Sequence, residues 1–361
     1  MKSNLLRSVQ ALRGLAALSV MFFHFRWNLN STYPGIGDML FGWGATGVDL
    51  FFLISGFVIT LSAKKTVPGV RGALNFLKGR ALRILPAYYI ILLITFFLSG
   101  AMSTFHYPDK TLNFISALIF QPIYQYNGPF YLDDSGMYGI RWTLNYELYF
   151  YIIVGLLIAV PFRKLTTWLF FFATLIVIPL VGFNCFTFSP EGYQTGVAQL
   201  NFVTNPMIFL FIAGVFIGLL YPLLSRLNGV MMVCLLAASF TMTFVLFRNG
   251  MFVGHGLLSS GWLYFLILMT AIGSEKIIGK YIPEFLIRLG DISFSLYLIH
   301  TLMNTGIGKR FGSIGIEDGL SRFFISCVLS LILAWLSWRF IEKPFLSMHR
   351  IKSQQEQPQT A

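Results

Sequence analysis

Long blocks of this chain contain no charged side chain. No Asp, Glu, Lys or Arg occurs between Glu191 and Arg226, or between Arg248 and Glu275. Apolar runs of about 18 residues or more are typical of membrane-spanning helices. Only 11% of the 361 residues are charged, against about 25% in average soluble domains. The sequence therefore predicts an all-α, polytopic integral membrane protein and excludes a water-soluble globular domain.

Ten apolar segments are long enough to cross a bilayer, at about 20 residues a pass. Their approximate limits are 8–25, 41–62, 84–101, 142–162, 165–183, 206–222, 229–247, 256–273, 291–307 and 322–340. A shorter apolar segment, Thr111–Tyr124, contains Pro122, and we interpret it as an interfacial or re-entrant helix in an external loop. We expect residues 1–349 to form one membrane domain and the polar residues 350–361 to form a disordered tail.

The chain carries a formal net charge of +12. In a soluble protein this excess would favour nucleic acid as a partner, but membrane proteins concentrate Lys and Arg in cytoplasmic loops. With ten spans and the N-terminus inside, 19 of the 26 basic residues lie on the cytoplasmic side. The distribution predicts both termini in the cytoplasm and no nucleic acid partner. The three cysteines have no metal-site spacing, so we expect no metal and no disulfide framework.

Few ionisable side chains fall inside the predicted spans. Such a group costs about 2.5–3.5 kcal/mol at a helix centre on insertion scales, so each one is a candidate functional residue. These residues are Arg13, His24, Asp49, Glu147 and His300. Three other histidines, His106, His255 and His349, fall in predicted loops, and we assign them no role.

Arg13 and His24 are eleven residues apart, which is about three helical turns, so they share one face of the first span. The rise between them is about 16 Å, roughly half the hydrocarbon thickness. Arg13 is therefore expected near the cytoplasmic surface, and His24 at mid-depth or beyond. Two structural alternatives stand beside a functional role. Arg13 can extend to lipid phosphates, and His24 can be a buried polar residue that packs helices.

Asp49 lies in the second span, after Gly47-Val48. A carboxylate at this depth needs a partner. The economical partner is Arg13, or His24 if it is protonated. The alternative is a structural ion pair that holds two spans together.

Glu147 lies near the external end of the fourth span, four residues after Thr143 and on the same helix face. It can orient an imidazole or a sugar hydroxyl. The alternative is an acid near the surface that pairs with Arg141 or Arg26.

Two further pairs are spaced three residues apart. Tyr297 and His300 lie in the ninth span, where a histidine with satisfied hydrogen bonds in the core is the alternative to a functional one. Arg80 and Arg83 adjoin the start of the third span and can bind a phosphate from one helix face. Their alternative role is to fix the orientation of the chain in the membrane.

Several motifs occur in a fixed order along the chain. They are Arg13-x10-His24, Gly47-Val48-Asp49-Leu50-Phe51-Phe52 with Ser55-Gly56-Phe57, Arg80-Ala81-Leu82-Arg83 with Pro86, Trp142-Thr143-Leu144 with Glu147, Ser295-Leu296-Tyr297-Leu298-x-His300, and Glu342-Lys343-Pro344. Together with the ten-span layout they resemble the acyltransferase 3 family of membrane O-acyltransferases, over nearly the whole chain. Thr143 stands where the family has serine and keeps the hydroxyl group. The chain resembles the stand-alone form, as in O-antigen and exopolysaccharide O-acetyltransferases, without the hydrolase-like domain of some members.

The resemblance implies transfer of an acyl group, commonly acetyl, from acyl-CoA to a carbohydrate hydroxyl. No tightly bound cofactor is expected, because acetyl-CoA or another acyl-CoA is a co-substrate. The expected partners are the acyl-CoA, a carbohydrate acceptor and membrane lipid, in a bacterial-type cytoplasmic (inner) membrane. The donor is expected on the cytoplasmic side and the acceptor often on the outer side.

The resemblance also suggests roles for individual residues. His24 is expected to act as a general base, because a neutral imidazole can take a proton from the attacking hydroxyl. Arg13 would steer the donor or polarise the thioester, and Asp49 or Glu147 would set the tautomer of His24. Arg80 and Arg83 would bind the CoA phosphates. The predicted substrate-binding residues are Trp142, Thr143, Tyr149, Tyr297 and His300.

Other functions stay open at the level of sequence. One is a transporter or flippase for lipid-linked sugars, which also uses sparse intramembrane charges. Another is an acyltransferase that acts on a lipid, a protein or a small molecule. Both direct transfer and a transient acyl-enzyme are compatible with the sequence. The loop tyrosines Tyr124, Tyr126, Tyr131 and Tyr138 can stack on sugar rings, although aromatic residues at membrane interfaces are common.

Overall fold

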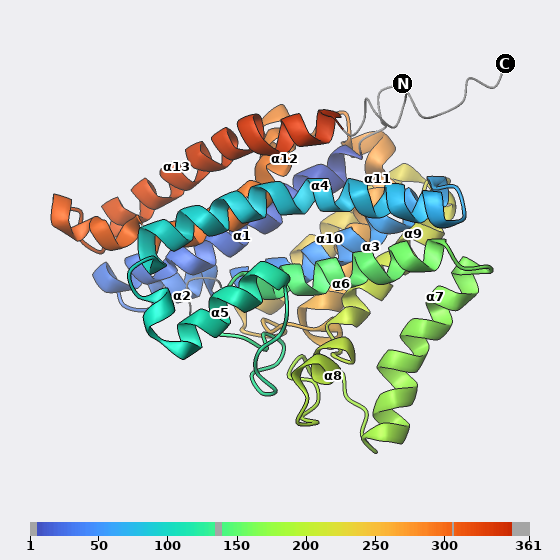
Figure 1. The fold of residues 1–361 in the computed structure, drawn as a ribbon. Coiled ribbons are helices and arrows are strands. Elements are labelled where there is room, and N and C mark those ends of the chain that lie inside the picture. The colour runs from blue at the N-terminus through green and yellow to red at the C-terminus, as the bar shows by residue number, and fades with distance from the viewer. Residues whose placement is uncertain (1–5, 134–138, 305–306, 349–361) are drawn as a thin grey trace.

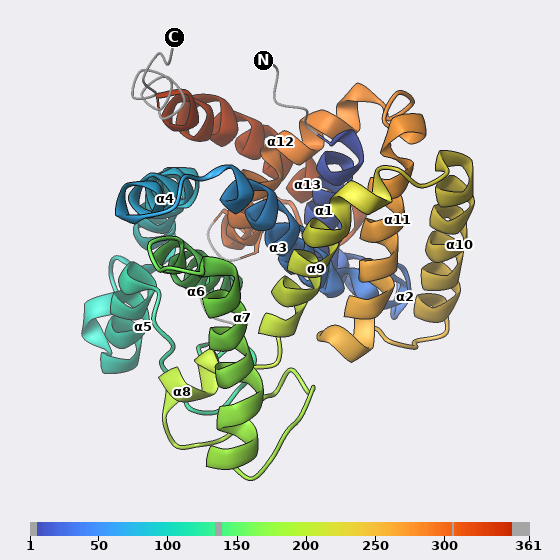
Figure 2. The same cartoon turned by 90° about the vertical axis from the view of Figure 1, so that its right-hand side faces the viewer.

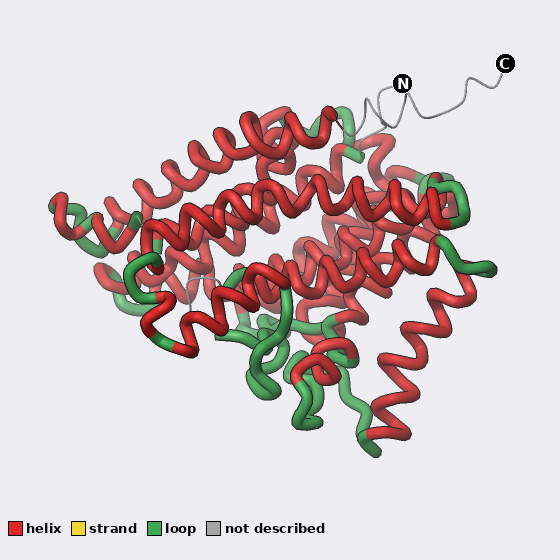
Figure 3. The backbone as a smooth tube through the Cα atoms, in the orientation of Figure 1, coloured by secondary structure: helices red, strands yellow, loops and turns green. Residues whose placement is uncertain are grey.

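The computed structural model describes residues 6–133, 139–304 and 307–348, and these ranges contain helices but no strand (Figure 1, Figure 3). The all-α fold class is thereby confirmed. The longer helices are α1 (Arg7–Thr32), α3 (Gly47–Lys65), α4 (Val70–Thr95), α6 (Arg141–Ile158), α7 (Arg163–Phe172), α9 (Ile208–Leu224), α10 (Gly229–Arg248), α11 (Trp262–Ile278), α12 (Glu284–Ile299) and α13 (Leu320–Ser337). The predicted tail over residues 350–361, and also Tyr138 and His349, lie outside the described residues.

Short helical segments extend or connect these helices. The separate ones are α2 (Ile36–Phe41), α5 (Pro108–Ile119) and α8 (Ala198–Val203). Helix α7 continues as a π-helix over Ala173–Gly182, and α12 as a 3-10 turn over His300–Met303. Helix α13 continues through a π-helical turn, Trp338–Glu342. Some ends follow directly from the sequence, since the Asn228 side chain accepts hydrogen bonds from the first free backbone amides of α10.

Nine helices within the described ranges are long and apolar enough to cross a membrane. They coincide with nine of the ten predicted spans, and the protein is a polytopic membrane protein. The remaining predicted span, the fourth, is α6, which has 18 residues. It is less apolar than the nine because Arg141, Asn145 and Glu147 all lie in its first half. The polar side chains of α6 are therefore concentrated in the N-terminal half of this helix.

The helices pack as neighbouring pairs, chiefly α1 with α12, α3 with α9, and α10 with α11 (Figure 2). Helix α1 begins at the end of the bundle where α13 finishes (Figure 1), as an even number of crossings requires. Helix α7 leans away from the other helices in both views (Figure 1, Figure 2). The predicted short helix in the loop after the third span is α5, which has 12 residues. It is held by hydrogen bonds from Tyr88 and Tyr89 of α4 to the carbonyls of Ala117 and Leu118, at 2.8 and 2.7 Å.

Glycines set the closest helix contacts. A Cβ atom added at Gly56 of α3 would lie 2.0 Å from the Phe211 carbonyl oxygen of α9. The same addition at Gly214 of α9 would lie 2.0 Å from the Leu53 carbonyl oxygen of α3. The two helices therefore meet backbone to backbone, as small residues allow in membrane bundles.

Replacing Gly56 with valine is expected to destabilise the α3–α9 contact by about 1–3 kcal/mol or more, because two backbones must separate to admit the side chain. The measurement is the thermal unfolding midpoint of the detergent-solubilised protein. Gly42→Ala is the matched control, since an added Cβ there meets nothing within 4 Å. Equal midpoints for the two variants would contradict this account of the packing.

Candidate active site

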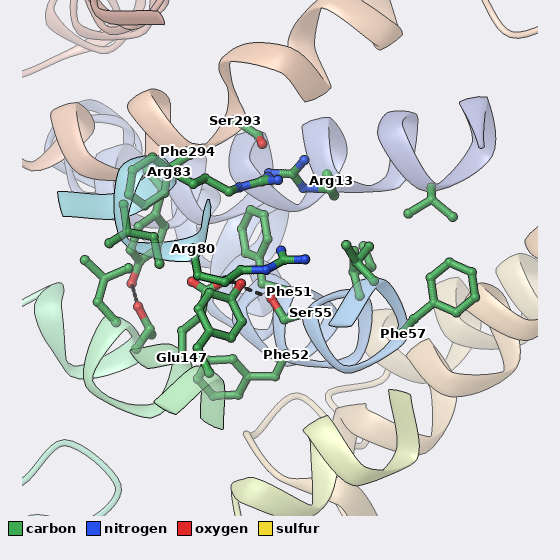
Figure 4. Close-up of a pocket in the computed structure, with 18 of the residues that line it drawn as sticks. Arg13, Phe51, Phe52, Ser55, Phe57, Arg80, Arg83, Glu147, Ser293 and Phe294 are labelled. Atoms are coloured by element: carbon green, nitrogen blue, oxygen red, sulfur yellow. Dashed lines mark hydrogen bonds between the residues drawn. The ribbon is translucent and has the colours of Figure 1, made fainter. Parts of the chain in front are cut away.

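A cavity of about 240 Å³ lies among α1, α3, α4, α6 and α12. Its walls are largely apolar and include the phenylalanines Phe51, Phe52 and Phe57 of α3 (Figure 4). Three arginines, two from α4 and one from α1, and one glutamate from α6 also line it. The sequence motifs of five spans thus meet around one space inside the membrane domain.

The arginines are Arg13, Arg80 and Arg83 (Figure 4). The Arg13 Nη1 atom lies 3.5 Å from Gln10 Oε1, and the Arg80 guanidinium carbon lies 5.3 Å from the ring centroid of Tyr151. Within the ranges that the structure describes, none of the three forms a salt bridge within 4.0 Å. The cavity therefore holds a concentration of positive charge that a bound anion would neutralise.

Glu147 lies in the wall of this cavity but is already hydrogen-bonded. Its Oε1 atom accepts a hydrogen bond from Ser55 Oγ at 2.9 Å and another from the Tyr151 hydroxyl. The carboxylate thus joins α6 to the Ser55-Gly56-Phe57 motif of α3. Its negative charge acts on Arg13 and Arg80 through space, whereas the sequence left Arg141 and Arg26 as its possible partners. Arg26 instead binds Asp38 at 2.8 Å.

A second buried carboxylate, Glu342, was not singled out as an intramembrane charge. It lies in the π-helical turn after α13, is 5% exposed and accepts a hydrogen bond from Ser295 of α12. The predicted tenth span ended at residue 340, whereas the helical segment runs on to Met348. The Glu342-Lys343-Pro344 motif could have indicated this position. If the last span is extended past residue 340 to include the motif, Glu342 falls inside the bundle.

Thr143 and Tyr297 line the cavity and connect α6 to α12. Thr143 Oγ1 donates a hydrogen bond to the Tyr297 hydroxyl at 2.7 Å, and this hydroxyl donates to the Ile140 carbonyl at 3.1 Å. The Tyr297 ring also packs on Phe51, with ring centroids 6.0 Å apart. These contacts fix the position of the Tyr297 phenol, and all of the groups involved are uncharged.

Beyond Tyr297 lie two histidines. The Tyr297 and His300 ring centroids are 5.7 Å apart, and those of His300 and His24 are 4.9 Å apart. His300 is fully buried; its Nδ1 lies 3.2 Å from the Leu296 carbonyl, and its Nε2 has no hydrogen-bond partner among the described residues. Asn304 Nδ2 donates to the His24 carbonyl at 2.9 Å and ties the turn after α12 to α1. His300 is thus only partly satisfied as a core histidine.

Arg13 and His24 both lie on the side of α1 that faces α12. Arg13 shares the cavity with Ser293 of α12, while His24 packs on His300 at the end of α12. His24 is not among the residues that line the cavity. The two residues are therefore on one helix face, as their spacing predicts, but they occupy successive compartments along it.

Asp49 does not pair with Arg13 or His24. Its carboxylate is fully buried and binds three groups of the segment before α11: His255 Nδ1 at 2.8 Å, the Gly256 backbone amide at 2.8 Å and Ser260 Oγ at 2.7 Å. The expectation that it sets the His24 tautomer is therefore wrong in this structure. Its partner is His255, which was assigned no role from the sequence and which also packs on Trp142, with ring centroids 5.6 Å apart.

Two other predicted substrate-binding residues, Trp142 and Tyr149, pack against aromatic rings outside the cavity. Trp142 packs between Phe52 and Phe130, and Tyr149 packs on Phe202 of α8. Neither of them lines the cavity. Tyr149 keeps a buried hydroxyl with no hydrogen-bond partner among the described residues.

The loop tyrosines also differ from one another. Tyr124 and Tyr126 stack with ring centroids 5.3 Å apart, whereas Tyr131 is fully buried and its hydroxyl accepts a hydrogen bond from Asn205 at 2.8 Å. Burial raises the pKa of Tyr131 to about 12, although the Asn205 bond lowers it. Tyr131 is thus a core residue of the loop and not a surface for stacking.

Residues 6–339 match the family described as an acyltransferase domain, acyltransferase 3. The chain belongs to this family and is a membrane O-acyltransferase.

Similar proteins include nodulation protein 10 of Rhizobium leguminosarum bv. viciae, 26% identical over 93% of this chain and 92% of that protein. The exopolysaccharide production protein ExoZ of Rhizobium meliloti is 26% identical over 86% of this chain and 92% of that protein. A protein of Staphylococcus aureus (strain COL), provisionally named an O-acetyltransferase, is 26% identical over 95% of this chain, which spans only 58% of it. No solved structure matches.

Asp49→Asn is expected to loosen the segment before α11, because an amide cannot accept hydrogen bonds on both of its terminal atoms. Losing such bonds to a charged group costs about 1.5–3 kcal/mol. Hydrogen exchange should accelerate at Gly256 and its neighbours. Asp38→Asn, at an exposed pair worth about 0–1 kcal/mol, is the control. Unchanged protection of Gly256 in Asp49→Asn would refute the anchoring role.

Proposed function

We propose that this protein transfers an acetyl group from acetyl-CoA to a hydroxyl of a surface or lipid-linked polysaccharide. The donor enters from the cytoplasmic side of a bacterial-type inner membrane, and both termini lie in the cytoplasm. The observation that carries the proposal is the cavity with three arginines and a single, already hydrogen-bonded glutamate among its lining residues. The names of the exopolysaccharide and O-acetyltransferase relatives support the acceptor and the acyl group.

The cavity has the chemistry of a site for a polyanionic thioester. Arg80 and Arg83 lie one helical turn apart on α4 and face the same space as Arg13. Guanidinium groups bind phosphate oxygens through paired N–H donors. The phenylalanine walls suit an uncharged arm between the phosphates and the thioester. In this proposal the phosphates bind at the arginines and the thioester reaches the Thr143–Tyr297 end.

The transfer step then runs through the histidine pair. A hydroxyl of the acceptor gives its proton to a neutral His24 imidazole while its oxygen attacks the thioester carbonyl carbon. The carbon–sulfur bond breaks, and the proton passes from His24 to the leaving sulfur, which restores neutral histidine. The ring of Tyr297, which lines the cavity, contacts His300, and the ring of His300 contacts His24. His300 acts in this proposal through its contact with His24, as a positioning residue.

Arg80→Ala and Arg83→Ala are each expected to raise the KM for acetyl-CoA by about 10- to 100-fold, because each removes charge-assisted hydrogen bonds worth about 1.5–3 kcal/mol. The acceptor KM should stay unchanged. Initial rates with labelled acetyl-CoA and the polysaccharide fraction measure both values. Arg71→Ala removes an exposed arginine that does not line the cavity and is the control. Unchanged donor KM in both α4 variants would place the donor elsewhere.

His24→Ala is expected to lower kcat by at least about 100-fold, the usual contribution of a general base, while acetyl-CoA still binds. Transfer of labelled acetyl into polysaccharide measures the rate, and equilibrium binding of acetyl-CoA shows that the fold and donor site persist. His106→Ala, at an exposed histidine of a loop, is the control. Wild-type transfer by His24→Ala would remove His24 from the chemistry. A transporter would incorporate no label in any of these proteins.

A further inference from the structure

A second cavity, of about 200 Å³, lies between α3, α6, α7 and α9. Most of its lining is apolar and includes Phe150, Phe171 and Ile212. Two of its lining residues, Trp168 and Leu219, are each 39% exposed, so the cavity reaches the outer surface of the bundle. An apolar cavity that opens on the membrane-facing surface is accessible to lipid chains.

Three cations lie at one end of this cavity: Lys64, Arg163 and Lys164. They come from the last turn of α3 and the first turn of α7. No aspartate or glutamate is among the lining residues, and none of the three cations forms a salt bridge within 4.0 Å in the described ranges. Their charges therefore remain uncompensated by the described side chains.

Backbone carbonyls hold two of these cations in place. Lys64 Nζ donates to the Gly218 carbonyl of α9 at 2.8 Å. This carbonyl is free because the residue four positions later is Pro222, which has no N–H to donate. Arg163 Nη1 donates to the Thr66 carbonyl at 2.9 Å. These bonds fix the positions of the charges without neutralising them.

Chain orientation alone accounts for basic residues at the cytoplasmic ends of helices. It does not account for three of them at the end of one apolar cavity, two of them in the first turn of a helix, where the helix dipole disfavours positive charge. A phosphate group bound among them would offset both the mutual repulsion and the dipole. The apolar part of the cavity requires a ligand that also has a hydrocarbon portion.

We propose that this cavity binds an anionic glycerophospholipid. The phosphate group lies among Lys64, Arg163 and Lys164, and one acyl chain enters the cavity beside Ile212. Charge complementarity selects an anionic lipid over a zwitterionic one of equal chain length. The inference is independent of the proposed function, because it concerns a site separate from the arginine cavity.

Native mass spectrometry of the full-length, detergent-solubilised protein tests the proposal. The probes are phosphatidylglycerol, phosphatidylcholine with the same chains, and inorganic phosphate. The test variant combines Lys64→Gln, Arg163→Gln and Lys164→Gln. The matched control combines Arg226→Gln, Lys276→Gln and Lys280→Gln, which remove exposed cations near the corresponding ends of α9 and α11. Ile212→Trp fills the apolar part and leaves the three cations in place.

Phosphatidylglycerol should bind wild type and the control variant alike, and bind the test variant at least about tenfold more weakly. Phosphatidylcholine should bind weakly to all three, and Ile212→Trp should weaken phosphatidylglycerol binding. Equal phosphatidylglycerol binding by wild type and the test variant would overturn the proposal. A second result would also overturn it: inorganic phosphate competes with the lipid, and Ile212→Trp binds the lipid as well as wild type does. The site would then recognise the phosphate group alone. Lipid mass is the readout, so neither result bears on acyl transfer.

Discussion

An ionised side chain in hydrocarbon must find a partner inside the protein, and the interior of this bundle is arranged around that requirement. Glu147 is bonded to Ser55 and Tyr151, while Asp49 is bonded to the segment before α11. Each carboxylate joins elements that are distant in the sequence. The same hydrogen bonds therefore lower the free-energy cost of burying the charge and fix the positions of the helices. The cavity arginines are the exception, because none of them forms a salt bridge in the described part of the chain.

Much of the fold could be predicted from sequence because the bilayer imposes a length and a polarity on every span. The spans and the short helix α5 follow from hydropathy and helical period. The partner of Asp49 could not be predicted. His255 is 206 residues away in a segment with no periodic pattern, and a tertiary contact of this kind leaves no local signal. Glu342 lies outside the predicted spans because the last one ends at residue 340, whereas the helical segment runs on to Met348.

Both cavities combine basic residues with apolar walls, but in different arrangements. In the first, Arg80 and Arg83 lie near the middle of α4, Arg13 lies in the second turn of α1, and phenylalanines of α3 line the same cavity. In the second, the cations lie at helix ends and the apolar part reaches the membrane-facing surface. The position of the basic residues along their helices therefore distinguishes the proposed donor site from the proposed lipid site.

The hydrogen bond between Thr143 and Tyr297 has a consequence for the cell as well as for the enzyme. A cavity that extends from one side of a membrane towards polar residues near the other is a potential leak for ions and protons. The Tyr297 phenol, held by Thr143 and the Ile140 carbonyl, lies between the arginines and the histidine pair as an uncharged layer. An uncharged ring held in this position would interrupt a file of water between the cavity and the histidines, and would thereby limit proton leakage across the membrane.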